Sequence, residues 1–151
     1  MKLSKIEKVL LLVVTILAIT IAILCAKLST PPSSCKGDAR CFEGIVTEVI
    51  DGDTLEIDSI RIRFALVDTP EYNQAGYSEA KDFISSMCPV GSAVIVDEDD
   101  NQAEGSGGRI VAAVYCNGKN LNEELVVRHL GIIDERFCGV SEFASEQWTG
   151  C

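Results

Sequence analysis

The chain begins with a stretch in which hydrophobic positions are continuous instead of periodic. Val9 to Ala26 carries no charged residue and is interrupted only by the small polar residues Thr15 and Thr20. This run of 18 uncharged residues lies near the lower limit of the roughly 17–25 that span a bilayer as a helix. The pattern predicts one N-terminal transmembrane helix, which we assign to residues 9–28.

Further along, the pattern changes to the two-residue alternation that is typical of strands. Gly44–Ile50, Thr54–Ile57 and Ile60–Val67 are rich in β-branched residues. They are separated by the turn-forming dipeptides Asp51-Gly52 and Asp58-Ser59. The sequence therefore predicts a three-stranded meander.

The rest of the chain mixes helical and strand patterns. The predicted elements are a helix at Ser78–Met87 capped by Ser78, strands at Ala93–Val96 and Ile110–Tyr115, a turn at Asn117-Gly118, a helix at Leu121–His129 capped by Asn120, and a last short helix that is capped by Ser141 and ends at Gln147. We expect a mainly β fold with helices, a five-stranded OB-type barrel, because closure leaves no exposed sheet edge. An α+β sandwich fits the pattern nearly as well.

Length and charge narrow the function. The 151 residues allow one modest domain and exclude a large multidomain enzyme. The chain has 13 basic and 23 acidic residues, and the part after residue 28 has 9 and 22, a formal charge of −13. Such a surface repels a polyanion, although salt screens the repulsion beyond about 8 Å. Any nucleic acid is therefore expected to bind weakly.

Cysteines indicate an oxidising compartment. An even number in a small exported domain predicts disulfides, whereas zinc is disfavoured because the sequence has no C-x-x-C pair. Spacing leaves the connectivity open, with a preference for Cys88–Cys116, because each lies beside a predicted strand that can pair with the other's neighbour. Six of the seven cysteines follow the apolar stretch, namely Cys35, Cys41, Cys88, Cys116, Cys138 and Cys151.

Basic residues ahead of the apolar stretch predict its orientation. Lys2, Lys5 and Lys8 are expected to stay in the cytoplasm. This favours a signal-anchor with the domain outside, and the alternatives are a cleaved signal peptide that releases a secreted protein and a buried core helix. The predicted organisation is a basic end at 1–8, the transmembrane helix at 9–28, a Pro/Ser tether at 29–40, the folded domain at 41–137 and a cysteine-containing tail at 138–151.

Two acidic turns could bind a hard cation. Asp51–Thr54 places two carboxylates at a tight turn, and Asp68–Glu71 places two more at the end of the third predicted strand. Ca²⁺ takes such oxygens, together with backbone carbonyls. Each motif alone is more simply a turn former with solvated acids, but their joint appearance beside one strand pair favours a site.

Arginines supply the opposite charge. Period-2 alternation places Arg61 and Arg63 on one face of a strand, either in salt bridges, at an exposed rim, or as a guanidinium fork for phosphate. Strict alternation directs Arg63 and Asp68 to opposite faces, so a shared site requires the chain to turn at Asp68. Arg109 is a second arginine at a strand entrance, after an ordinary glycine-rich loop.

Two further features have a structural interpretation. The run Asp97–Asp100 is expected to form a solvated face. His129 lies at a predicted helix end, where an imidazole interacts with helix carbonyls more readily than it performs catalysis.

These residues form a recognisable set. The order and spacing of the blocks resemble the staphylococcal-nuclease-like (thermonuclease) family over about residues 44–131. The blocks are Val49–Thr54, Ile62–Glu71, Gly108-Arg109 leading into Ala112–Tyr115, and Asn120–Val126. The resemblance implies an OB-fold endonuclease that cuts phosphodiester bonds in DNA and RNA with Ca²⁺ and leaves 3′-phosphate ends.

The resemblance also implies a role for each site residue. The Ca²⁺ ligands would be the carboxylates of Asp53 and Asp68 and the carbonyl of Thr69. Glu71 takes the general-base position, and Arg63 and Arg109 take the positions that hold the phosphate. One departure is Gly107, which stands where the family usually has a tyrosine.

The leading hypothesis is a membrane-tethered nuclease outside the cytoplasm that acts on nucleic acid with Ca²⁺. One alternative is an OB-fold module without turnover that binds nucleic acid, another anion or a protein. Another is a disulfide-stabilised surface protein that binds Ca²⁺ structurally.

Overall fold

The structure is a computed structural model that describes residues 6, 11, 13–15, 17, 20, 35–103 and 105–151. The chain separates into two compact units, Met1–Ser33 and Ser34–Cys151. The described positions of the first unit are helical and exposed, and the remainder of the transmembrane helix predicted at 9–28 lies outside the described residues. Within the part of the chain that the structure describes, no helix has the length and apolarity needed to cross a membrane.

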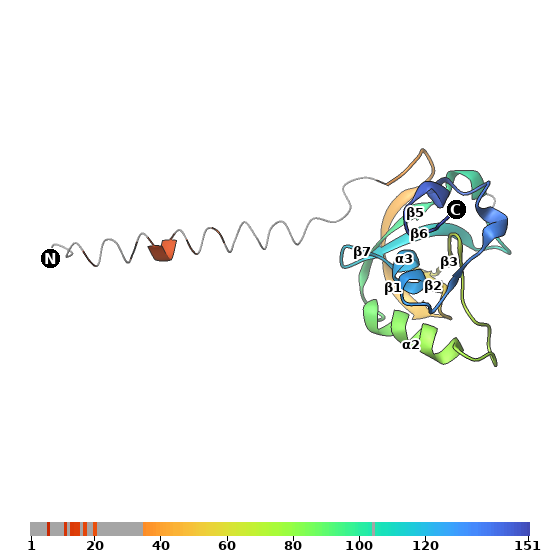
Figure 1. Cartoon of the computed structure of the whole chain (residues 1–151), viewed down its shortest axis with the longest axis horizontal. Helices are drawn as coiled ribbons and strands as arrows, with labels where there is room; N and C mark the ends of the chain where they lie inside the picture. Colours follow the sequence, from red (N-terminus) through yellow and green to blue (C-terminus); the bar gives the residue numbers. More distant parts are fainter. Residues whose placement is uncertain are drawn as a thin grey trace. The chain divides into compact units, whose positions relative to one another are not determined.

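The second unit contains a five-stranded closed β-barrel (Figure 1). Its strands are β1 (Cys41–Val49), β2 (Thr54–Ile57), β3 (Ile60–Phe64), β5 (Ala93–Glu98) and β6 (Ile110–Cys116). They follow the order β3-β2-β1-β5-β6, and a parallel pairing of β3 with β6 closes the barrel. The OB-type barrel expected from the sequence is thereby confirmed.

Shorter elements surround the barrel. They are β4 (Val67–Asp68), α2 (Tyr77–Met87), η1 (Asp100–Gln102), β7 (Lys119–Asn120), α3 (Leu121–Val127), β8 (Ile132–Ile133), η2 (Glu135–Phe137) and η3 (Glu142–Ser145). In Figure 1, α2 lies across one end of the barrel, and it contacts β1 and α3. It buries Ala80 and Ile84 in the core.

Alternation along β2 and β3 builds the core as the sequence predicts. Leu55, Ile57, Ile62 and Phe64 are at most 1% exposed. Because successive side chains of a strand point to opposite faces, burial of Ile62 and Phe64 turns Arg63 out of the barrel interior. The arginine can then serve a site on the barrel's outer surface.

The sequence predicts a cap for α2 and a cap for α3, and only the cap of α3 is confirmed. The Asn120 side chain caps α3 by accepting hydrogen bonds from the N–H groups of Asn122 (3.0 Å) and Glu123 (3.3 Å), as predicted. The prediction of Ser78 as the α2 cap is wrong, because the helix begins after Gly76, whose φ of 94° lies in the left-handed region, and has no side-chain cap.

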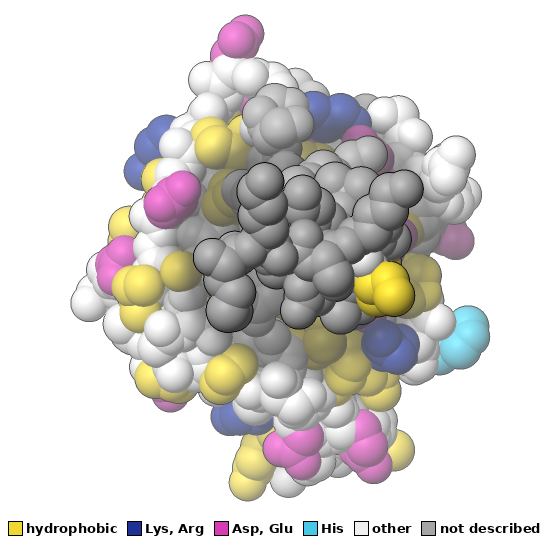
Figure 2. All heavy atoms as spheres, turned by 90° about the vertical axis from the view of Figure 1, so that its left-hand side faces the viewer, with side chains coloured by type: hydrophobic (Ala, Val, Ile, Leu, Met, Phe, Trp, Pro, Cys, Tyr) yellow, Lys and Arg dark blue, Asp and Glu magenta, His cyan; other side chains and the backbone are white. Residues whose placement is uncertain are grey.

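Helix α3 ends two residues before the predicted His129. His129 adopts φ 59° beyond the last turn, and its backbone N–H donates to the Val126 carbonyl (3.0 Å). Its exposed side chain projects at the edge of the face shown in Figure 2, where acidic, basic and hydrophobic side chains are interspersed.

Three disulfides join Cys35 to Cys41, Cys88 to Cys116, and Cys138 to Cys151. The preferred pair, Cys88–Cys116, is confirmed. It links the residue that follows α2 to the end of β6. The other two disulfides close short loops in the segments that precede and follow the barrel in sequence.

The acidic run is a correction to the sequence analysis. Asp97, Glu98 and Asp99 are 1%, 3% and 0% exposed, so the run is buried instead of forming a solvated face. We call Asp97, Glu98, Asp99 and Asp100 the acidic cluster. Its burial is possible because segments distant in sequence supply hydrogen-bond donors.

Those donors come from residues 36–40 and from the tail. The backbone N–H of Lys36 donates to Asp97 (2.9 Å), and the Arg40 guanidinium makes two hydrogen bonds to Glu98 (2.6 and 3.1 Å). Asp100 accepts from the N–H groups of Asp38 and Ala39, and Asp99 accepts from that of Glu142. Residues 36–40, which the sequence assigns to the tether, are therefore attached to the barrel.

Candidate active site

A turn after β3 brings Arg63 and Asp68 together. The predicted strand Ile60–Val67 stops at Phe64, and Leu66 takes φ 63°, a left-handed conformation that reverses the alternation. Arg63 Nη2 then lies 2.7 Å from Asp68 Oδ1. The turn that a shared site requires is present, two residues earlier than the sequence suggested.

Asn122 of α3 holds this turn in place. Its side chain is 0% exposed, and Nδ2 donates to the carbonyls of Ala65 (2.9 Å) and Ala112 (3.2 Å) while Oδ1 accepts from the N–H of Val114 (3.1 Å). The sequence analysis missed this positioning role. A polar residue on the inward face of an amphipathic helix was the available signal.

Asp53 lies beneath the arginine. It is 1% exposed and accepts hydrogen bonds from the Thr69 N–H (2.7 Å), the Thr69 hydroxyl (2.9 Å) and Arg63 Nη1. Gly52 permits this packing, since a Cβ there would meet Thr69 Oγ1 at 2.8 Å. Burial raises the pKa of Asp53 to about 6, although the charge of Arg63 acts in the opposite direction.

One cavity of about 310 Å³ collects four of the six residues assigned to the site. Arg63, Asp68, Glu71 and Arg109 all line it, although they come from β3, β4 and two separate loops. Asp53 and Thr69 are not among its lining residues; both are buried, and Asp53 contacts Arg63 from behind. The structure thus brings the predicted phosphate-binding and general-base residues together.

Loops position the other two lining side chains. The Glu71 N–H donates to Gln74 Oε1 (2.8 Å), and the Gln74 N–H donates to the Glu71 carbonyl (2.8 Å), so this loop closes on itself. Arg109 Nε donates to the Ser106 carbonyl (3.0 Å). No ion pair of Arg109 is found among the described residues, so its charge remains available to a ligand.

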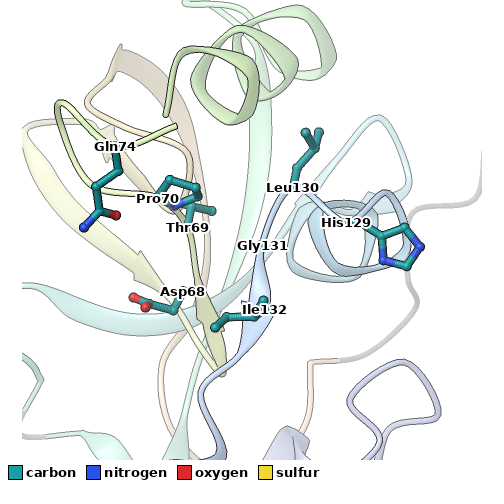
Figure 3. A pocket seen from close by; sticks show the side chains of 8 residues that line it. All are labelled: Asp68, Thr69, Pro70, Gln74, His129, Leu130, Gly131 and Ile132. Atoms are coloured by element: carbon teal, nitrogen blue, oxygen red, sulfur yellow. The ribbon is translucent and has the colours of Figure 1, made fainter. Parts of the chain in front are cut away.

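Asp68 also borders a second cavity of about 230 Å³ on its other side. Figure 3 shows Thr69, Pro70, Gln74 and Ile132 around this space. The two cavities therefore meet at the Asp68 carboxylate, whose side chain is 44% exposed.

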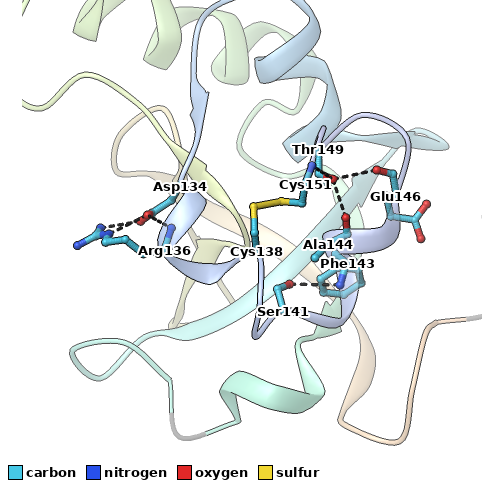
Figure 4. Close-up of a disulfide and its surroundings, with 9 residues drawn as sticks. All are labelled: Asp134, Arg136, Cys138, Ser141, Phe143, Ala144, Glu146, Thr149 and Cys151. Atoms are coloured by element: carbon cyan, nitrogen blue, oxygen red, sulfur yellow. Dashed lines mark hydrogen bonds and ion pairs between the residues drawn. A yellow bond between two sulfur atoms is a disulfide. The ribbon is translucent and has the colours of Figure 1, made fainter.

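Sequence analysis missed two charged residues that line the larger cavity, Asp134 and Arg136. They enter the site because β8 pairs with β4, Asp68 opposite Ile132, and because the Asp134 N–H donates to the Leu66 carbonyl (2.9 Å). Figure 4 shows the two joined by hydrogen bonds beside the Cys138–Cys151 disulfide. Nothing local in the sequence signals this placement, because it depends on a two-residue strand pairing.

The donor chemistry at Asp53, Asp68 and Thr69 suits a hard cation. Two carboxylates converge on one guanidinium, and burial raises the pKa of Asp53, so a nearby cation would favour its charged form. No group of three or more His, Cys, Asp or Glu residues suited to a metal occurs in the described ranges. The ligand set implied by the family resemblance is smaller, with the carboxylates of Asp53 and Asp68 and the Thr69 carbonyl.

Comparison with known proteins agrees with this geometry. Endonuclease YhcR of Bacillus subtilis (strain 168) is 33% identical over 112 residues, which cover 63% of this chain and 9% of that protein. An uncharacterized protein of Bacillus anthracis is 32% identical over 101 residues, covering 60% of this chain and 47% of the relative. This chain thus spans less than half the length of either relative.

A family comparison covers the central part of the domain. Residues 61–135, which contain Arg63, Asp68, Glu71 and Arg109, match the family described as staphylococcal nuclease homologue. Asp53 and the first two barrel strands precede the matched range. The comparison thus identifies a staphylococcal nuclease homologue domain at residues 61–135, the family that the motifs predict.

Proposed function

We propose that the domain is a Ca²⁺-dependent nuclease that hydrolyses phosphodiester bonds of DNA and RNA and leaves 3′-phosphate ends. The observation that carries the proposal is the shared cavity of Arg63, Glu71 and Arg109. Two guanidiniums and one exposed carboxylate are the groups needed to bind a phosphodiester and to activate water against it.

Each side chain has a defined task. Arg63 and Arg109 donate hydrogen bonds to the phosphate oxygens and stabilise the charge that develops on them. Glu71 accepts the proton of the attacking water as the new O–P bond forms. The P–O5′ bond breaks as O5′ takes a proton from solvent, Glu71 returns its proton to solvent, and the products are a 3′-phosphate and a 5′-hydroxyl.

Metal binding is assigned to Asp53, Asp68 and the Thr69 carbonyl. These oxygens would hold a Ca²⁺ ion, which would supply further positive charge for binding the phosphate. In the structure Arg63 donates hydrogen bonds to both Asp53 and Asp68. These two hydrogen bonds use two of the five N–H donors of the guanidinium, so Arg63 keeps donors that can bind a phosphate.

We also propose that the N-terminal segment tethers the domain outside the cytoplasm. The three disulfides support an oxidising compartment. Protease added outside intact cells should remove a domain that faces outward and leave one that faces inward intact.

Cleavage assays with the full, oxidised chain test the nuclease. Single-stranded DNA, duplex DNA and RNA are incubated in Ca²⁺ or in chelator, with Glu71→Gln and the matched control Glu79→Gln, an exposed residue in the first turn of α2. We expect Ca²⁺-dependent cleavage that Glu71→Gln lowers by at least about 10²-fold and Glu79→Gln preserves.

Two outcomes would contradict parts of this assignment. Full turnover in Glu71→Gln would remove Glu71 from the general-base role. A folded protein that binds Ca²⁺ without cleaving any substrate would instead favour a binding module or a structural Ca²⁺ protein.

The metal assignment has its own test. Asp53→Ala should raise the Ca²⁺ concentration needed for half-maximal activity, because it removes a buried carboxylate ligand. Asp82→Ala, an exposed acid of α2 outside both cavities, serves as the control. An unchanged Ca²⁺ titration for Asp53→Ala would show that the metal is held elsewhere.

A further inference from the structure

A third arginine lies at the cavity that contains Arg63 and Arg109. Arg136 belongs to η2, which follows β8 directly. The pairing of β8 with β4 and the hydrogen bond from Asp134 to Leu66 fix this segment against the Arg63–Asp68 turn. The cavity is thus lined by three guanidiniums from three separate segments.

Arg136 is held in place but keeps unused donors. Its Nε and Nη2 atoms donate to the two oxygens of Asp134 (2.8 and 2.6 Å), and its guanidinium lies 5.6 Å from the centre of the Phe137 ring. The side chain is 79% exposed, and no hydrogen bond from Nη1 is found in the part of the chain that the structure describes. A fixed guanidinium with free N–H groups is suited to a phosphate.

Charge makes this concentration of arginines unusual for the chain. Residues 29–151 contain only 9 basic residues, and three of them line this one cavity. Asp68, Glu71 and Asp134 balance them, so the cavity is close to neutral within a strongly acidic domain. The same neighbours link Arg136 to the site, since the pKa of Arg136 is raised by its hydrogen bond to Asp134 and also by the charge of Asp68.

We propose that Arg136 binds the phosphate next to the one that is cleaved, so that the cavity holds two consecutive phosphates of a nucleic-acid strand. This inference rests on the proposed nuclease function and extends it to substrate length. Arg63 and Arg109 act on the reacting phosphate, whereas Arg136 lies at the outer, exposed side, where the strand continues. The domain therefore prefers an oligonucleotide to a substrate with a single phosphodiester.

The test compares Arg136→Gln with Arg128→Gln. Arg128 is an exposed arginine paired with Glu124 that lines neither cavity, so both variants remove one positive charge from the surface. Steady-state kinetics of the full chain are measured on a single-stranded oligonucleotide and on a dinucleoside monophosphate, which has no neighbouring phosphate. The salt dependence of oligonucleotide binding is followed by fluorescence anisotropy.

We expect Arg136→Gln to lower kcat/KM about tenfold more for the oligonucleotide than for the dinucleoside monophosphate, mainly through KM. The salt slope of binding should fall by about 0.7, the value for one contact to a single-stranded phosphate. Arg128→Gln should give neither change. Equal losses on the two substrates, or a salt slope like that of Arg128→Gln, would overturn the proposal.

Asp134→Asn separates binding from a structural role. It keeps the Arg136 guanidinium but removes the competing negative charge, so we expect a lower KM for the oligonucleotide. A loss that matches Arg136→Gln would show that the pair only supports η2. If the wild type cleaves neither substrate, the proposed function fails, and the anisotropy comparison of Arg136→Gln with Arg128→Gln still decides the phosphate contact.

Discussion

Two groups of charged side chains lie close to the barrel, and they differ in exposure and in how far their hydrogen bonds are made within the protein. Asp97, Glu98 and Asp99 of the acidic cluster are buried, and every carboxylate of the cluster accepts a hydrogen bond from a backbone N–H, the Gln102 amide or the Arg40 guanidinium, while Asp97 Oδ1 has no partner among the described residues. In the larger cavity, by contrast, Arg136 is 79% exposed and Arg109 has no acidic partner among the described residues. Satisfied charges hold the fold together, while charges with spare hydrogen-bonding capacity indicate where a ligand binds.

The largest of the expected effects is the loss of stability in Asp99→Ala. Asp99 is fully buried and accepts from Asn101 N (3.1 Å), Gln102 Nε2 (2.7 Å) and Glu142 N (3.3 Å). Leaving these donors unpaired should lower the free energy of unfolding by about 3 kcal/mol. Urea denaturation measures the loss, and the exposed Asp38→Ala is the control. A change below about 0.5 kcal/mol would show that the cluster is not structural.

Arg109→Gln tests the role of the charges in the larger cavity. We expect an activity loss of about 10²-fold, or about 2.7 kcal/mol of transition-state stabilisation. Stability should stay within about 0.5 kcal/mol, because Arg109 makes no ion pair with a described residue. Kinetics and urea denaturation of the same preparation measure both quantities. A large loss of stability with little loss of activity would show that Arg109 supports the fold and does not bind the ligand.

The pKa of Tyr115 depends on the negative charge of the acidic cluster. Its effect on stability is the smallest of the expected effects. Burial raises the pKa of Tyr115 to about 12, and the charge of Asp97 acts in the same direction. Since the unfolded pKa is about 10, the folded state holds the proton more tightly. Tyr115 therefore destabilises the fold as pH rises from about 10 to about 12, and has no such effect below that window.

Unfolding experiments at several alkaline pH values test whether Tyr115 lowers the stability of the fold as the pH rises. The wild type should lose more stability above pH 10 than Tyr115→Phe, while Tyr72→Phe on the exposed surface should follow the wild type. Asp97→Asn should lower the pKa of Tyr115 in a spectroscopic titration. Identical alkaline profiles for wild type and Tyr115→Phe would contradict the assignment.

Local chemistry in the sequence was enough for the barrel strands and for two helix caps, Asn120 of α3 and Ser141 of η3. Thr54–Ile57 is a strand with the predicted bounds, and Asn120 caps α3, because alternation and capping depend on residues within a few positions of each other. The Cys88–Cys116 pair also followed from neighbouring strand predictions. These features need no knowledge of distant contacts.

Features that depend on distant contacts were missed. Burial of the acidic cluster requires donors about 60 residues earlier, such as Lys36 and Ala39, and about 40 residues later, such as Glu142. Composition alone therefore indicated a solvated face. Arg136 reaches the cavity only through the short pairing of β8 with β4.

For the site, the sequence identified residues better than it identified their arrangement. It grouped Arg63, Glu71 and Arg109, which the structure places in one cavity. It could not locate the turn at Leu66, since a left-handed conformation at a leucine is imposed by tertiary contacts such as the hydrogen bonds of Asn122 to Ala65 and of Asp134 to Leu66.

The Cys35–Cys41 disulfide has a mechanical consequence. It joins the residue at the start of the folded unit covalently to the first residue of β1. Tension carried by the chain ahead of Cys35 therefore bypasses residues 36–40 and enters the barrel at β1. That strand is hydrogen-bonded to β2 on one side and to β5 on the other, so two ladders share the load before any strand can peel away.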